Sequence, residues 1–310
     1  MTTFADVPGD TKVFMNGEFI NWEDATVHVM THALHYGSSV FEGIRCYKTP
    51  KGPAVFRFHE HMKRLYNSAK MYRMTPEIPV AELSENVLEV IRLNNFEECY
   101  IRPIVFRGTG PFGVSPMNNS IDIAVCCWLW GSYLGPEALE NGVNVHVSSW
   151  NRLAPNTMPA LAKCGANYAN GQLIKMEALL NGYAEGIALD VYGYVSEGSG
   201  ENIFIVQGNT LTTTPLGNSV LPGITRDSVM TLAREAGYQV LEAPMPREML
   251  YIADEVFFTG TAAEITPLAN IDQIQIGAGK RGPVVKDLQE RFFAVIDGDA
   301  EDKYGWLTFV

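Results

Sequence analysis

The chain has 310 residues, and because single hydrophobic cores stop growing at roughly 250–300 residues, two domains are expected. Hydrophobic residues make up 46% of it and charged residues 19%, the composition of an ordinary folded protein. The formal net charge of -12 argues against a nucleic-acid-binding surface, which needs clustered lysine and arginine.

Several other classes of protein are disfavoured. The longest apolar run, residues 121–130, contains Asp122 and is about half as long as a membrane span. Residues 1–10 lack the basic flank and apolar run of a secretory signal, so we expect none. The 5 cysteines are odd in number and have no CxxC spacing, and the 6 histidines have no metal-ligand spacing. We therefore expect no disulfide framework, no metal site and a cytoplasmic location.

The first part of the chain predicts a mixed α/β unit. Asn16-Gly17 is the commonest tight hairpin turn, and it separates two short apolar runs. Residues 60–74 predict a helix because apolar side chains recur there at three- and four-residue steps, and residues 83–91 repeat the pattern. Two segments rich in β-branched and aromatic residues predict sheet strands, at 100–106 and 121–128.

Residues 131–140 are the predicted linker, because turn-forming residues crowd its start at a change of composition. Beyond it we expect a strand, a long helix and two hairpins, at 143–149, 168–181, 187–195 and 203–211. A further helix is expected at 225–236, with Thr225 as its N-cap and Gly237 just past its end.

The strongest motif is the run EGSGENIF at 197–204, followed by LTT at 211–213 and LPGITR at 221–226. It resembles the signature of the class IV aminotransferases, which are fold-type IV pyridoxal-phosphate enzymes. Further runs are similar to those of the bacterial branched-chain aminotransferases: HALHYG at 32–37, FEGIR at 41–45, YIRP at 100–103, APNT at 154–157, LD at 189–190 and GTAAE at 260–264.

The resemblance implies an α/β (α+β) protein with two domains. A small α/β domain would span residues 1–130, and a larger pseudo-barrel domain that binds the cofactor would span 141–310. It also implies a homo-oligomer whose minimal unit is a dimer, with a hexamer as a larger alternative. The partners expected are small amino acids and 2-oxo acids, with no nucleic acid and no membrane.

Lys163 matches the family's Schiff-base lysine, which is the catalytic residue and also holds the cofactor. A solvated surface lysine would be the commoner interpretation of a single lysine, but its neighbours here are small and apolar. Glu197 matches the acid that keeps the cofactor's pyridine nitrogen protonated. Glu201 is the competing acid, and we interpret it as structural.

The other cofactor contacts follow from the motif. Gly223, Ile224 and Thr225 open a helix, whose N-terminus offers amide donors to a phosphate, and Gly223 would let the backbone approach closely. Arg64 matches the family's phosphate arginine, although spacing alone would favour a solvated charge. Three further contacts are implied by the resemblance: Tyr168 to the phenolic oxygen, Leu221 against the ring face, and Thr261.

The substrate site is expected to combine amide donors, arginines and aromatic side chains. The amides of Thr261 and Ala262 look like the pair that binds an α-carboxylate. Arg102 is our choice for the second carboxylate of glutamate, and Arg45 is the runner-up. The expected walls of an apolar pocket are Tyr36, from the partner subunit in one arrangement, Phe41, Tyr100, Trp130 and Tyr133.

The function implied is reversible transfer of an amino group between L-leucine, L-isoleucine or L-valine and 2-oxoglutarate. Rivals within the same fold are a D-amino-acid or (R)-amine aminotransferase and an aminodeoxychorismate lyase. Rivals of other classes are a nicotinamide oxidoreductase, against which the lack of a strand-GxGxxG-helix unit counts, and a binding module without cofactor.

Overall fold

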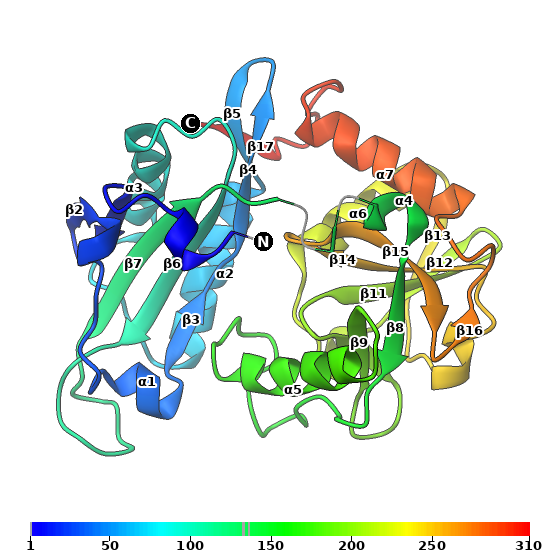
Figure 1. Ribbon diagram of the computed structural model, residues 1–310, viewed down its shortest axis with the longest axis horizontal. Coiled ribbons are helices and arrows are strands. Elements are labelled where there is room, and N and C mark those ends of the chain that lie inside the picture. The colour runs from blue at the N-terminus through cyan, green and yellow to red at the C-terminus, as the bar shows by residue number, and fades with distance from the viewer. Residues whose placement is uncertain (1, 132–133, 136) are drawn as a thin grey trace. The chain divides into compact units, whose positions relative to one another are not determined.

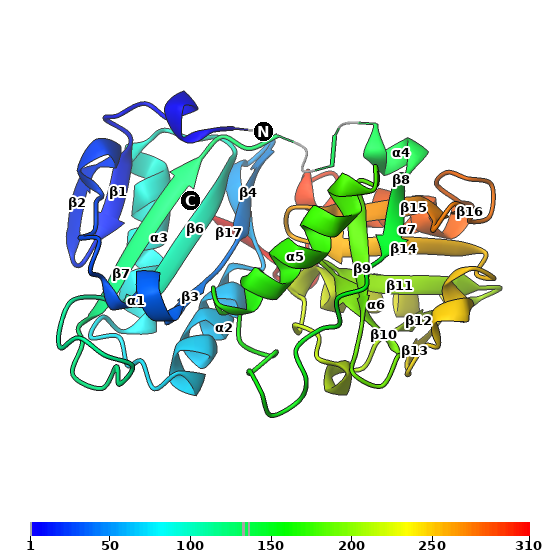
Figure 2. The same cartoon turned by 60° about the horizontal axis from the view of Figure 1, so that its bottom comes forward.

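The computed structural model describes every residue except 1, 132, 133 and 136. The chain forms two compact units, drawn in Figure 1 and, from another side, in Figure 2. Unit 1 comprises Met1–Gly131, Ala162–Ala166 and Val295–Val310, and unit 2 comprises Ser132–Leu161 and Asn167–Ala294. The predicted division assigned everything after residue 140 to the second domain; the compact units differ in that 162–166 and 295–310 belong to unit 1.

Unit 1 is built on an antiparallel sheet in the order β17-β5-β4-β6-β7-β1-β2, with β3 paired to β6. The predicted hairpin is confirmed, since Asn16 and Gly17 both adopt positive φ, 50° and 98°, as the tight turn requires. The strands are β1 (Lys12–Met15), β2 (Glu18–Asn21), β3 (Ser39–Phe41), β4 (Ile44–Thr49), β5 (Gly52–Phe56), β6 (Cys99–Arg107), β7 (Ile121–Trp128) and β17 (Leu307–Phe309).

Two amphipathic helices, α2 (Phe58–Met71) and α3 (Val80–Leu93), cover one face of this sheet. Because side chains alternate along a strand, Ile101 on β6 and Val125 on β7 point into the core beneath the helices. Their neighbours Arg102 and Cys126, which pair across the two strands, lie on the opposite face. The short helix α1 (His32–Tyr36) precedes β3.

Unit 2 contains a mixed sheet in the order β10-β9-β8-β15-β14-β11-β12-β13, with β16 paired to β15, which curls into a half-barrel. The predicted α/β fold is confirmed. Its strands are β8 (Val143–Val147), β9 (Glu185–Leu189), β10 (Val195–Gly198), β11 (Asn202–Gln207), β12 (Thr210–Thr213), β13 (Gln239–Glu242), β14 (Glu255–Gly260), β15 (Glu264–Ile271) and β16 (Ile274–Gln275).

The helices of unit 2 include α6, which was predicted with one error. It begins at Ile224, so its N-cap is Gly223 and Thr225 lies inside the first turn; the prediction of Thr225 as N-cap was wrong. The end at Gly237 is confirmed, with φ of 87°. The other helices are α4 (Ala138–Asn141), α5 (Asn167–Leu180), α6 (Ile224–Glu235) and α7 (Pro283–Ile296), the last of which ends in unit 1. Short 3-10 helices lie at Phe4–Asp6, Trp22–Asp24, Leu216–Asn218 and Arg247–Leu250. Within the described part of the chain, no helix is long and apolar enough to cross a membrane.

Candidate active site

Lys163 lies in a short segment that runs beside β3 in unit 1. The Phe41 N–H donates to the Lys163 carbonyl (3.0 Å), and the Gly165 N–H donates to the Ser39 carbonyl (2.9 Å). On the other side, the Lys163 N–H donates to Ser68 Oγ on α2 (3.1 Å). The Lys163 Nζ lies 5.1 Å from the centre of the Phe41 ring. The lysine backbone is therefore fixed to both β3 and α2, and its amine rests against an aromatic ring.

Arg64, the predicted phosphate arginine, forms a bidentate ion pair with a buried carboxylate. Its Nε and Nη2 donate to the two oxygens of Glu42 at 2.7 and 2.8 Å. His61, one turn earlier on α2, donates from Nδ1 to Glu42 Oε2 at 2.7 Å, which assigns the proton to that nitrogen. Glu42 is 0% exposed and His61 is 1% exposed. The sequence analysis did not identify this triad.

The charges of the triad are set by burial and by its members. Burial would raise the pKa of Glu42, but the Arg64 guanidinium and then His61 outweigh it and hold that pKa well below its ordinary value. Burial lowers the pKa of His61, and the positive charges of Arg64 and Lys163 add to this effect, against the opposing carboxylate of Glu42. At neutral pH the charge of Arg64 is therefore offset by Glu42, with His61 neutral.

Arg102 projects from the outer face of the unit 1 sheet among aromatic rings. Its guanidinium carbon lies 4.6 Å from the ring centre of Phe41, 5.6 Å from that of Tyr100 and 5.7 Å from that of Trp128. Among the described residues, no carboxylate forms an ion pair with Arg102, and its buried Nε has no hydrogen-bond partner. The ring face of an aromatic side chain attracts a cation without neutralising it, so the arginine keeps its charge.

The other predicted pocket residues of unit 1 differ in where they lie. Trp130 stacks on Tyr100 with ring centres 4.8 Å apart, next to the Arg102 cluster. Arg45 instead donates from Nη2 to the carbonyl of Gly131 at 3.0 Å. Tyr36 is 48% exposed on α1 and contacts His32, so it does not join the aromatic rings around Arg102 within this chain. The predicted Tyr133 lies outside the described residues.

A glycine of the FEGIR run explains why that motif contains a residue without a side chain. A Cβ at Gly43 would lie 1.9 Å from the Tyr100 hydroxyl and 2.8 Å from the ring carbon that carries it. Both atoms belong to a ring already packed against Trp128 and Trp130. Gly43 therefore makes room for the aromatic cluster.

Glu197 lies in unit 2 in an ion pair that the sequence analysis missed. Its Oε1 is 2.7 Å from Arg152 Nη2, and both side chains are 7% exposed. Its Oε2 accepts from Asn202 Nδ2 (3.2 Å) and from the Leu221 N–H (3.0 Å). A buried carboxylate needs such partners, and Arg152 supplies the countercharge within the protein itself. Asn202 and Leu221 come from the signature, whereas no motif drew attention to Arg152.

Glu201 is also buried but has a different electrostatic environment. Burial and the nearby carboxylate of Glu185 raise the pKa of Glu201 to about 8, although the Gly200 N–H, which donates to it at 3.1 Å, opposes this. Lys175 pairs with Glu185 at 2.7 Å and not with Glu201. The two acids of the signature therefore differ, since Glu197 has a cation beside it and Glu201 is held in its protonated form at neutral pH.

The N-terminus of α6 offers a buried set of donors. Ile224 and Thr225 are 7% and 3% exposed, and the first amides of a helix have no acceptor within the helix. Such an end suits an anion. Gly223 has a steric role that differs from the expected approach to a phosphate, because a Cβ there would lie 1.9 Å from Asn202 Oδ1. The glycine and the asparagine of the signature thus require each other.

The remaining predicted residues of unit 2 lie at the ends of elements. Tyr168 is the second residue of α5 and is partly buried. Thr261 and Ala262 are partly buried in the turn between β14 and β15, as the motif predicted. The structure thus brings Lys163, Arg64, Phe41, Arg102 and Tyr100 into unit 1, and the remainder of the cofactor set into unit 2.

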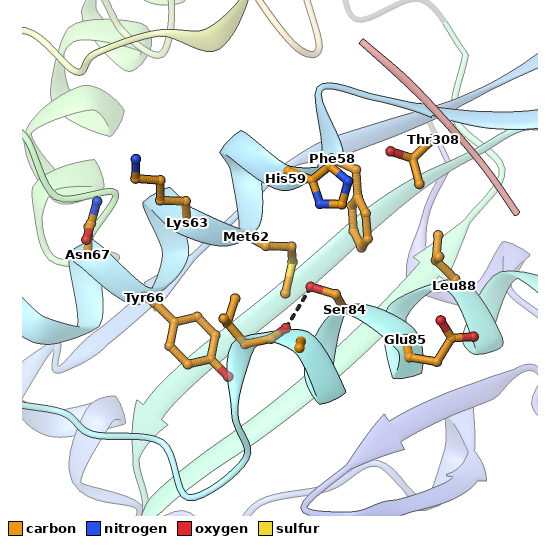
Figure 3. Close-up of a pocket in the computed structure, with 12 residues that line it drawn as sticks. Phe58, His59, Met62, Lys63, Tyr66, Asn67, Ser84, Glu85, Leu88 and Thr308 are labelled. Carbon is orange, nitrogen blue, oxygen red and sulfur yellow. Dashed lines mark hydrogen bonds between the residues drawn. The ribbon is translucent and has the colours of Figure 1, made fainter. Parts of the chain in front are cut away.

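A separate cavity of about 610 Å³ lies between α2 and α3, as Figure 3 shows. Its walls are Phe58, Met62, Tyr66 and Leu88, with Lys63 at its rim. None of the predicted site residues is among those that line it. The cavity lies on the helix-covered side of the sheet, whereas Arg102 projects from the other face.

Comparison with known proteins gives consistent matches over nearly the whole chain. The family model described as amino-transferase class IV matches residues 39–271. The branched-chain-amino-acid aminotransferase of Escherichia coli (strain K12) is 55% identical over 299 residues, which cover 96% of this chain and 97% of the relative. A crystal structure of the E. coli branched-chain amino acid aminotransferase superposes with a TM-score of 0.94 at 54% identity, covering 96% of this chain and 98% of that one.

A second solved relative, the branched-chain amino acid aminotransferase of T.th., is similar in two complexes. One contains N-(5'-phosphopyridoxyl)-L-glutamate and the other 4-methylvaleric acid. Each is 46% identical with a TM-score of 0.92, and each match covers 97% of this chain and 98% of the relative.

Proposed function

Because the chain belongs to the class IV aminotransferase family, we propose that it is a branched-chain amino-acid aminotransferase. It would transfer an amino group reversibly between L-leucine, L-isoleucine or L-valine and 2-oxoglutarate. The observation that carries this proposal is the outer face of the unit 1 sheet, where aromatic rings surround an arginine that has no acidic partner among the described residues. Aromatic rings suit a branched aliphatic chain, and the arginine suits the extra carboxylate of glutamate.

The donor set fits pyridoxal 5'-phosphate. A lysine lies on an aromatic ring, a buried carboxylate is held ionised by Arg152, and a buried helix N-terminus offers amides. When bound, this cofactor supplies an electron sink that makes the proton on the substrate α-carbon removable. Lys163 would hold the cofactor covalently and Glu197 would face its pyridine nitrogen. The amides at Ile224 and Thr225, together with Arg64, would take the phosphate.

Each of these residues has a chemical task of its own. The Lys163 amine would accept a proton from the substrate α-carbon and return it on the other side of the transfer. Glu197, kept charged by Arg152, would stabilise a proton on the ring nitrogen. The amides of Thr261 and Ala262 would bind the α-carboxylate that all the substrates share, which leaves the outer face of the unit 1 sheet to distinguish side chains.

Arg64 would contribute position more than charge. Glu42 engages two of the five N–H donors of a guanidinium and offsets its positive charge. Arg64 would thus offer directed hydrogen bonds to a phosphate, while much of the electrostatic stabilisation would come from the helix N-terminus. Arg64→Met should weaken binding of the cofactor, measured by titrating the cofactor-free protein with pyridoxal phosphate.

The proposal is tested with a panel of L- and D-amino acids. The purified protein should be yellow, and L-leucine, L-isoleucine, L-valine and L-glutamate should each change its visible spectrum. A response to D-amino acids or (R)-amines alone would favour a relative of the same fold, and pyruvate release from aminodeoxychorismate would indicate the lyase. A colourless protein that binds no pyridoxal phosphate would overturn the proposal.

Two further parts of the proposal concern the state of the protein. We expect a homodimer as the minimal active unit, with a hexamer as a larger assembly, and sedimentation velocity would measure which is present. We also expect a cytoplasmic location, since all five cysteines are free thiols.

A further inference from the structure

Arg102 is held by aromatic rings rather than by an acid. An arginine that pairs with a carboxylate, as Arg64 does with Glu42, has its direction fixed and its charge offset at the same time. For Arg102 the three ring contacts fix the position of the guanidinium, and no carboxylate of the described chain forms an ion pair with it. Position and available charge are therefore separated at this residue.

Trp128 provides the ring on the β7 side of the guanidinium. In the β6–β7 ladder, Trp128 pairs with Tyr100 while Arg102 pairs with Cys126, so Trp128 is the diagonal neighbour of Arg102 on the same face. Its ring centre is 5.7 Å from the guanidinium carbon. The position of Trp128 is fixed in turn by two rings, Tyr100 at 5.4 Å and Trp130 at 5.8 Å.

The three rings around Arg102 come from three different strands. Phe41 ends β3, Tyr100 lies on β6 and Trp128 ends β7. Phe41 and Tyr100 are already assigned to the pocket, and Phe41 also contacts Lys163. Trp128 is the ring whose contact with Arg102 has no other evident use. Indole also binds cations more strongly than the rings of tyrosine or phenylalanine.

We propose that Trp128 is a positioning residue that determines dicarboxylate specificity: it holds the Arg102 guanidinium in place, with its charge available for the second carboxylate of glutamate or 2-oxoglutarate. This inference rests on the role given to Arg102 under the proposed function. Trp128 would act through Arg102 and would have little effect on the transfer from leucine, whose side chain carries no charge.

The test compares single-turnover reactions of the holoenzyme with L-glutamate and with L-leucine. Trp128→Met keeps an apolar side chain but removes the ring, and it should slow the reaction with glutamate by ~3–30-fold, the equivalent of one cation–π contact. The reaction with leucine should change by less than about twofold on the same reasoning. Trp128→Phe keeps a weaker ring, so the ratio of glutamate to leucine rates should follow the order Trp, Phe, Met.

Inhibition gives a second readout that does not depend on turnover. Glutarate, which has two carboxylates, should inhibit Trp128→Met more weakly than the wild type, whereas 4-methylvalerate should inhibit both equally. The double variant Arg102→Met/Trp128→Met should lose no more glutamate activity than Arg102→Met alone, because the tryptophan would then have nothing to position.

Trp306 offers a matched control in unit 1. Its ring lies 5.2 Å from the guanidinium carbon of Arg57, but Arg57 also pairs with Glu60 at 2.6 Å. Trp306→Met should therefore lower the melting temperature without changing the ratio of glutamate to leucine rates.

The outcomes separate the inference from the proposed function. Equal losses for glutamate and leucine in Arg102→Met would remove the role of Arg102 and, with it, that of Trp128. A selective loss in Arg102→Met together with an unselective loss in Trp128→Met would overturn the inference alone. If Trp128→Met does not fold, the comparison of Trp128→Phe with the wild type decides, and an unchanged ratio there would overturn the inference.

Discussion

The guanidinium carbon of Arg102 lies 4.6 Å from the centre of the Phe41 ring. The amine of Lys163 lies 5.1 Å from the centre of the same ring. One aromatic side chain thus contacts both the proposed cofactor lysine and the proposed carboxylate-binding arginine. This places the residue that would distinguish substrates close to the residue that would move the proton.

Arg102→Met should weaken the half-reaction with glutamate by ~10–1,000-fold, which corresponds to the loss of one charged hydrogen bond or more. Leucine should suffer less, because its side chain offers no carboxylate to the guanidinium. The measurement is the single-turnover change in cofactor absorbance with each amino acid.

Arg45→Met is the matched comparison, since Arg45 already donates to the Gly131 carbonyl. Its effect on both substrates should be small. A loss confined to glutamate in this variant would move the role to Arg45, and equal losses for both substrates in Arg102→Met would assign Arg102 to the shared α-carboxylate.

Borohydride reduction of the holoenzyme should attach the cofactor permanently to Lys163, because reduction converts the linkage between the lysine and the cofactor into a stable secondary amine. Peptide mapping locates the modified residue. Lys163→Ala should fold, as judged by circular dichroism, and lose essentially all turnover. Recovery of the label on Lys175 or Lys286 would refute the assignment.

Glu197→Gln should leave the cofactor bound but lower kcat, because a neutral amide cannot stabilise a proton on the ring nitrogen. The amide oxygen can still accept from Arg152, which pairs with Glu197 at 2.7 Å in the wild type, so the fold should persist. Steady-state kinetics with leucine measure the effect, and Glu201→Gln serves as the comparison. A larger fall in kcat for Glu201→Gln would exchange the roles of the two acids.

Glu201→Gln should stabilise the protein at pH 8 and much less at pH 5. Because the pKa of Glu201 is raised from 4.5 to about 8, the folded protein holds a proton that the unfolded chain has lost over that interval. The wild type therefore loses stability as the pH rises from about 4.5 to about 8, and the neutral amide avoids this loss. We expect the melting temperature to rise by roughly 5 °C at pH 8. An equal change at both pH values would show that Glu201 is not protonated in the folded state.

The sequence by itself determined the local structure and the family. Asn16-Gly17 specifies its turn, the apolar spacing specifies α2, and Gly237 specifies the end of α6, because each depends on residues a few positions apart. The signature at 197–226 likewise indicated the class of chemistry, since its side chains are close together along the chain.

Only the tertiary structure decided which charges meet. Glu42 with Arg64, Arg152 with Glu197, and Trp128 with Arg102 are separated by 22 to 45 residues along the chain, and no periodicity relates them. The association of Lys163 with unit 1 depends on backbone hydrogen bonds to Phe41 and Ser68, far away in sequence. A buried ion pair or ring contact is selected by the packing of distant elements, so the sequence could name the chemical groups but not the partners that set their charge and position.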